Sequence, residues 1–60
     1  MSHSPIRDAR KAKRLSQQEV ANKVGVSKAT VSDWERGRMF PRPDKAVALV
    51  KALPGLTLNK

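Results

Sequence analysis

The sequence predicts an all-α fold of four to five helices, and three observations lead to this prediction. Hydrophobic residues recur at the three- and four-residue spacing of an amphipathic helix. A Ser or a Pro, both common at helix starts, stands before each such segment. A Gly, common at helix ends, follows three of the four segments closely. With only 60 residues, these helices form one domain.

The composition excludes several classes of protein. Thirteen Lys and Arg against five Asp and Glu give a net charge of +8, so an anionic partner is expected, nucleic acid first and an anionic membrane surface second. The chain has no Cys and a single His, His3, so we expect no metal site, no catalytic triad, no cofactor and no enzymatic activity. No apolar run reaches the roughly 18 residues of a membrane span, and residues 1–5 do not resemble a secretory signal.

Residues 1–4 are predicted to form a flexible N-terminal tail that leads into a first helix over 5–14. Ser4 is its expected N-cap, and Pro5 suits the first turn because its missing N–H would have no partner there. One face of this helix carries Ile6, Ala9, Arg10 and Lys13.

Two further helices follow with a short turn between them. Ser16 and Glu19 form a capping box that starts a helix over 17–24, and Gly25 ends it. Ser27 is the expected cap of the next helix, 28–36, which Gly37 ends. A basic loop over 37–42 leads to a last helix over 43–53. Its predicted apolar side consists of Ala46, Val47, Leu49, Val50 and Leu53.

The two central helices have the pattern of a helix-turn-helix over residues 17–36. Ala21 is small enough for the helices to cross closely, and Gly25 suits the left-handed turn. The apolar residues expected between the helices are Val20, Val24, Val26, Val31 and Trp34. We therefore predict a helix-turn-helix domain over 5–54 and a short C-terminal tail over 55–60, which is a candidate dimerisation segment.

Three motifs, LSQQEVA at 15–21, VGVS at 24–27 and VSDWERG at 31–37, together with the helix from Pro43 to Leu53, resemble the Cro/C1-type (XRE-like) helix-turn-helix proteins of phages and bacteria. The resemblance implies a compact lambda-repressor-like domain that binds double-stranded DNA, usually a transcriptional regulator acting as a dimer. Members usually have a fifth helix, for which residues 56–60 are too short. The brevity of the chain resembles the short Cro-like repressors, which would bind a palindromic operator.

Residues on the outer face of the 28–36 helix are candidates for reading bases, because the N-terminal part of this helix enters the major groove in such a motif. Lys28 can donate to guanine or to phosphate, and Ala29 can contact a thymine methyl. Ser32 can donate or accept. Asp33 either accepts from cytosine or pairs with Arg36. The alternative is an ordinary solvated face.

A second group is expected to hold phosphates. Main-chain N–H groups at a helix start attract anions, which makes Gln17 and Gln18 candidates. The resemblance also implies that Gln17 braces the recognition helix. Basic residues at and after the end of that helix are well placed to clamp the DNA backbone. They are Arg36, Arg38 and Arg42.

The remaining selected residues are interpreted as structural. Arg10 lies on the inner face of the first helix and needs a partner, and the resemblance implies a pair with Glu35. Met39 and Phe40 are expected to cover the core rather than to wedge between bases. Ala21, Gly25, Val31 and Trp34 are assigned to the packing of the two motif helices.

Two functions from different classes remain. The first is a repressor that binds a double-stranded DNA operator as a homodimer, which can form on the DNA itself, in the cytoplasm of a bacterial or phage-infected cell. The second is an antitoxin-like module whose main ligand is a protein, an interpretation for which only Leu56 and Leu58 offer a surface. Neither requires a membrane or a small-molecule ligand.

Overall fold

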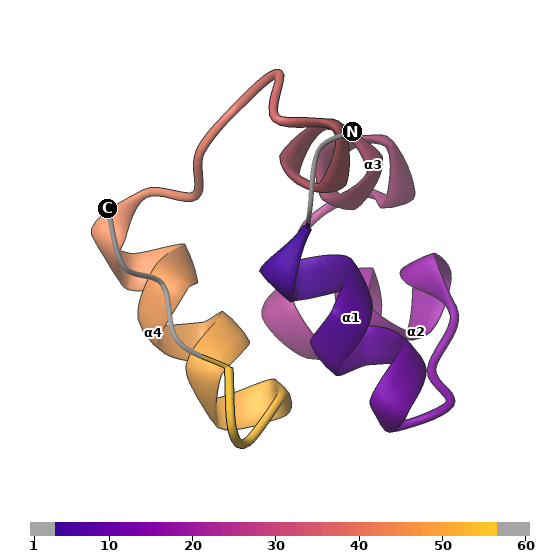
Figure 1. Ribbon diagram of the computed structural model, residues 1–60. Coiled ribbons are helices and arrows are strands. Elements are labelled where there is room, and N and C mark those ends of the chain that lie inside the picture. Colours follow the sequence, from indigo (N-terminus) through magenta and orange to yellow (C-terminus); the bar gives the residue numbers. More distant parts are fainter. Residues whose placement is uncertain (1–3, 57–60) are drawn as a thin grey trace.

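Four α-helices make up most of residues 4–56, the part of the chain that the computed structural model describes. They are α1 (Pro5–Ala12), α2 (Gln17–Val24), α3 (Lys28–Arg36) and α4 (Pro43–Ala52), with no strand among these residues (Figure 1). The all-α prediction is therefore confirmed. Most of the predicted N-terminal tail and residues 57–60, Leu58 among them, lie outside the described residues.

Serine side chains begin the first three helices, as the sequence predicts. Each serine Oγ accepts a main-chain N–H three residues ahead and so pairs a donor that the helix leaves without a partner. The bonds are Ser4 with Arg7 at 3.1 Å, Ser16 with Glu19 at 3.0 Å, and Ser27 with Thr30 at 3.2 Å. At the fourth helix Arg42 occupies the N-cap without a side-chain bond, and Pro43 makes the first turn.

The capping box at the start of α2 is complete. In addition to the bond from Glu19 to Ser16 Oγ, the Ser16 main-chain N–H donates to Glu19 Oε1 at 2.8 Å. The Ser16 main-chain donor, and then the Ser16 side chain, hold the pKa of Glu19 below its ordinary value. The box thus stabilises the ionised carboxylate together with the first turn.

The end of α1 differs from the prediction. The helix stops at Ala12, and Arg14, which was expected inside it, adopts the left-handed conformation with φ of 58°. Leu15 N–H donates to Arg10 O at 3.1 Å and Arg14 N–H to Lys11 O at 2.9 Å, the two bonds of a Schellman motif. Glycine usually occupies this position, so an arginine there gave no signal of a helix end.

The other two turns match their sequence signals. Gly25 (φ 89°) ends α2 and Gly37 (φ 77°) ends α3, both in the left-handed region that a residue with a Cβ rarely adopts. At the last helix the boundary moves by one residue, since α4 ends at Ala52 and Leu53 is its C-cap.

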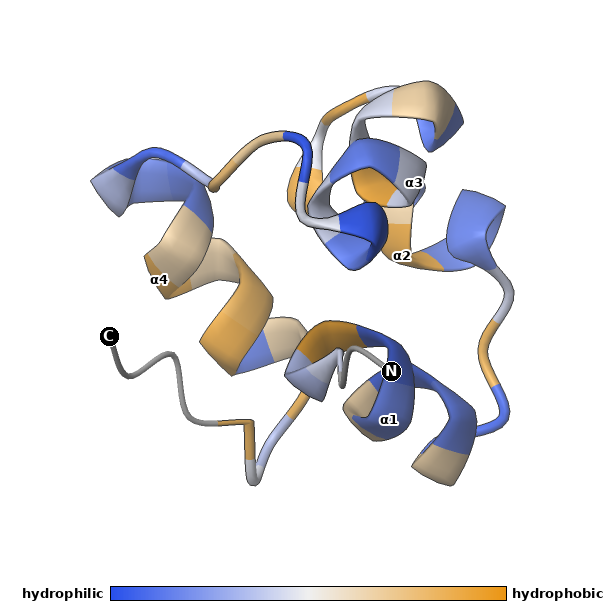
Figure 2. Cartoon of the chain, turned by 45° about the horizontal axis from the view of Figure 1, so that its top comes forward, coloured by the Kyte–Doolittle hydropathy of each residue, from blue (hydrophilic) through white to orange (hydrophobic). Residues whose placement is uncertain are grey.

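All four helices contribute to one core. Its buried residues are Ile6, Val20, Ala21, Val24, Val31, Trp34, Leu49, Leu53 and Leu56. In Figure 2, α4 is the most hydrophobic helix apart from its hydrophilic first turn, whereas hydrophilic residues dominate α1. The core therefore depends strongly on α4, which packs mainly against α2.

The buried face of α4 matches the prediction at Leu49 and Leu53 but not at the two valines. Leu49 and Leu53 are fully buried, and Ala48 and Ala52 pack beside them, but Val47 and Val50 are 55% and 42% exposed. The helix is turned so that Ala48 and Ala52 lie against the core. Small residues permit this close approach, which leaves the two valines at the surface.

Candidate nucleic-acid interface

The third helix has one buried side and one open side. Val31 and Trp34 are buried in the core, whereas Lys28, Ala29 and Arg36 are exposed. Two other predicted base-reading residues, Ser32 and Asp33, are half-buried. The open side near the start of α3 therefore presents a cation, a methyl group and a hydroxyl, which can recognise base edges.

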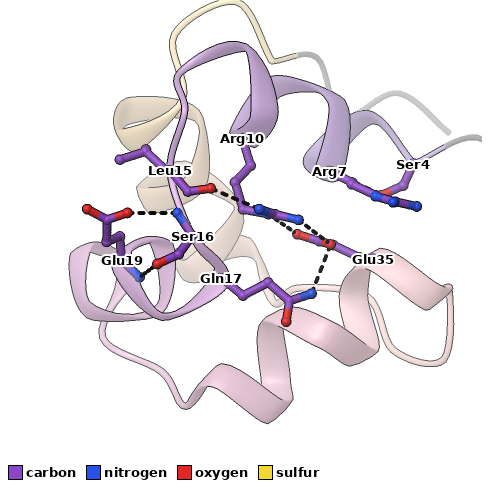
Figure 3. Close-up of polar contacts among 8 residues, drawn as sticks. All are labelled: Ser4, Arg7, Arg10, Leu15, Ser16, Gln17, Glu19 and Glu35. Carbon is purple, nitrogen blue, oxygen red and sulfur yellow. Dashed lines mark hydrogen bonds and ion pairs between the residues drawn. The ribbon is translucent and has the colours of Figure 1, made fainter.

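Glu35 joins the three helices of the N-terminal half (Figure 3). Its Oε2 accepts from Arg10 Nε at 2.6 Å, and its Oε1 accepts from Arg10 Nη2 at 3.2 Å and from Gln17 Nε2 at 3.0 Å. The Arg10 and Glu35 side chains are only 12% and 5% exposed. Because charged groups this deep need partners, the pair fixes α3 against α1, and Gln17 adds a link to α2.

The arginine is also bonded on its other side. Arg10 Nη1 donates to the carbonyl oxygen of Leu15 at 2.8 Å, just after the Schellman turn. The guanidinium thus connects the α1–α2 turn to α3. Within residues 4–56 no buried side-chain nitrogen or oxygen is left without a hydrogen bond, so this polar cluster is fully paired.

Gln17 and Gln18 stand at the start of α2, where both were predicted. The Gln17 amide nitrogen donates to Glu35, and Gln18 Nε2 donates to Asn22 Oδ1 at 3.0 Å within the helix. The main-chain N–H of Gln17 is the first of the helix and has no helical acceptor. An anion at this point would therefore meet main-chain N–H groups and the positive end of the helix dipole.

The loop after α3 carries further exposed cations, Arg38 and Arg42. Its first residues are fixed, because the main-chain N–H groups of Arg38 and Met39 donate to Asp33 O at 2.9 and 3.4 Å. Beyond this point the chain arches clear of the helices before it enters α4 (Figure 1).

The prediction that Met39 and Phe40 cover the core is wrong, since Met39 is 49% and Phe40 is 86% exposed. The core forms without these two side chains, since neither is among its buried residues or among the hydrophobic residues packed against it.

Two roles were predicted for Asp33, contact with a cytosine and an ion pair with Arg36, and the described part of the chain does not contain the second. Among residues 4–56, no ion pair connects Asp33 to Arg36. The main-chain carbonyl of Asp33 accepts from the N–H groups of the loop that follows α3, and the residue as a whole is half-buried.

One further cation, Lys45, lies near the turn of the motif. A Cβ added at Gly25 would lie 3.7 Å from Lys45 Nζ, so this ammonium group from α4 stands beside the turn between α2 and α3. It lies near the end of α2, where a positive charge is favourable for the helix dipole. Only the packing of α4 on α2 brings the two positions together, and no local sequence pattern signals it.

Two other classes of site have no counterpart in the described part of the chain. Residues 4–56 contain no group of three or more His, Cys, Asp or Glu side chains that could hold a metal ion. No helix in that range is long and apolar enough to cross a membrane.

Comparison with known proteins agrees with this architecture. The chain is 41% identical over 54 residues to the ImmF control region 10 kDa protein of Bacillus phage phi105, which covers 90% of this chain and 59% of that protein. It is 41% identical over 51 residues to the cryptic phage CTXphi transcriptional repressor RstR of Vibrio cholerae, which covers 85% of this chain and 46% of that protein. The chain thus spans about half the length of these curated relatives.

No solved structure matches the chain at a significant level. A family model described as helix-turn-helix matches residues 6–59, which include all of α2, the turn and α3. The resemblance inferred from the sequence motifs is confirmed, and the chain belongs to this helix-turn-helix family.

Proposed function

We propose that the chain is a sequence-specific regulator of transcription that binds double-stranded DNA in the cytoplasm of a bacterial or phage-infected cell. The observation that carries the proposal is the orientation of α3. Its apolar side is buried and its Lys28 end is open, as a helix that enters the major groove requires. The relative named as a phage transcriptional repressor supports repression as the outcome.

The residues have distinct roles in this proposal. Lys28, Ala29, Ser32 and Asp33 face the bases from the open side of α3, and α3 keeps its angle through Glu35. Phosphates are held on both flanks of the groove. The groups that hold them are the start of α2 at Gln17 and Gln18, and the cations Arg36, Arg38 and Arg42.

The regulator is proposed to bind a palindromic operator as a homodimer, which can form on the DNA. Val47 and Val50 are three residues apart on α4 and both are exposed, so they offer an apolar patch for a two-fold contact. Among residues 4–56 the core has nine buried side chains, and so small a core leaves little margin of stability, which favours association.

Site selection from a pool of random duplexes tests the proposal, followed by affinity measurements from about 50 to 200 mM salt. If each subunit neutralises about four phosphates, a dimer gives a log–log slope near −7, since each contact contributes roughly 0.9. An enriched half-site with this slope supports the proposal. A slope shallower than about −3, or no binding without a protein partner, would favour a protein-interaction module instead.

A further inference from the structure

Phe40 is the most exposed large hydrophobic side chain among the described residues, at 86%. Burying a phenylalanine side chain gains enough free energy to raise a binding constant at least tenfold. A partner that covers the Phe40 ring would therefore gain affinity. Phe40 is neither among the buried residues of the core nor among the half-buried hydrophobic residues that pack against it.

The loop presents this ring in a restricted way. On one side, Arg38 and Met39 are bonded through their main-chain N–H groups to Asp33 O at the end of α3. On the other side Pro41 and Pro43 restrict φ, and Arg42 between them is extended, with φ of −66° and ψ of 161°. The ring therefore has less freedom to lose on binding than it would have in an unrestrained loop.

The charges around Phe40 indicate what it contacts. Arg38 and Arg42 stand two residues before and two residues after it, and all three side chains are exposed. A second copy of the chain, with its own net charge of +8, would be repelled by these two cations. DNA would instead supply phosphates to both guanidinium groups and apolar base faces to the ring.

We propose that Phe40 enters the minor groove beside the half-site and wedges into a base step there, with Arg38 and Arg42 on the two phosphate strands. The proposal rests on the function proposed above. With the start of α3 in the major groove, the loop after α3 passes over the adjoining backbone toward the next groove. Pyrimidine–purine steps unstack most easily, so a TA or CA step flanking the half-site is preferred without any hydrogen bond to its bases.

The test uses the selected duplex with 2-aminopurine placed at the flanking step and, as a probe control, at a step inside the half-site. Wild-type protein should raise the fluorescence at the flanking step only, because the wedge unstacks it. Phe40→Ala should abolish this rise and weaken binding roughly tenfold, with the salt slope unchanged because every cation is retained.

Two matched variants and one measurement without DNA complete the experiment. Phe40→Leu should retain most of the affinity and part of the signal, and Met39→Ala should change the affinity less than about twofold. Wild-type binding that Phe40→Ala leaves unchanged would overturn the wedge alone. A wild-type chain that binds no duplex would overturn the proposed function as well. Loss of self-association by Phe40→Ala in sedimentation without DNA, with no change in fluorescence, would place the ring against a second copy and overturn the wedge.

Discussion

Arg10 of α1 and Glu35 of α3 lie 25 positions apart in the chain and are joined by two hydrogen bonds of 2.6 and 3.2 Å. The same carboxylate accepts from Gln17 of α2. One side chain near the end of α3 therefore sets the position of this helix against both other helices of the N-terminal half. The site is positioned from the interior, and its outer side chains are left open for a ligand.

Removal of Glu35 should destabilise the protein more than removal of Arg10. Glu35→Ala leaves a guanidinium that is 12% exposed, cannot lose its proton and keeps only its bond to Leu15, so stability should fall by about 3 kcal/mol. Arg10→Met should cost less, since the Glu35 carboxylate keeps its hydrogen bond from Gln17 Nε2. Urea unfolding of both variants gives the two free energies.

The double variant Arg10→Met with Glu35→Leu serves as the control, because an apolar pair leaves no buried charge and should recover most of the stability. Equal and negligible losses of stability in the two single variants would show that the pair contributes nothing.

The helices and their starts could be predicted because each depends on neighbours in the sequence. Ser16 with Glu19, or Gly25 after Val24, is a local signal that tertiary packing did not override. The rotation of α4 and the position of Phe40 could not be predicted in this way. They depend on which side of α4 packs most closely, and alanines at 48 and 52 decide that only when the other helices are in place.

The same distinction holds within the candidate site. The helical spacing of residues 28–36 predicts the open side of α3, because the apolar Val31 and Trp34 identify the opposite side as the buried one. The approach of Lys45 to Gly25 has no local signal in the sequence, since the packing of α4 on α2 brings the two residues together.

Replacing Arg14 with glycine should stabilise the protein. The φ of 58° at Arg14 carries a steric cost of roughly 1–2 kcal/mol for a residue with a Cβ, which the greater freedom of glycine in the unfolded chain offsets in part. A net gain of about 0.5 kcal/mol is expected in thermal or urea unfolding. Lys13→Gly is the matched control, because Lys13 has φ of −93° and gains nothing from glycine, so this variant should be destabilised. A loss of stability in Arg14→Gly would contradict the strain argument.

Acid should weaken the start of α2 through Glu19. The folded pKa of this carboxyl lies below its ordinary value of 4.5, so its contribution is present above about pH 4.5 and is lost as the pH falls through the lower, folded value. Glu19→Gln should therefore be less stable than the wild type at about pH 7, and the difference should shrink on acidification. The free energy of unfolding of both proteins should be measured between about pH 3 and 7. The other carboxyls contribute equally in the two proteins, so their contributions cancel in the difference. A difference that does not change with pH would mean that the ionised form has no part in the capping box.

Substitutions of Lys28 and Arg38 should distinguish a side chain that contacts a base from one that contacts a phosphate. Both are exposed, but Lys28 stands at the start of α3 and Arg38 follows its end at Gly37. If Lys28 contacts a base, Lys28→Ala should cost about 1–3 kcal/mol on the selected site and relax the preference at one base pair, with little effect on random duplex. Arg38→Ala should weaken both duplexes alike and make the salt slope shallower by about 1 for each phosphate that the arginine no longer neutralises. Neither change touches Val31 or Trp34, so circular dichroism should show the fold intact. Should Lys28→Ala weaken the two duplexes equally, Lys28 would bind a phosphate, and base reading would pass to Ser32 and Asp33.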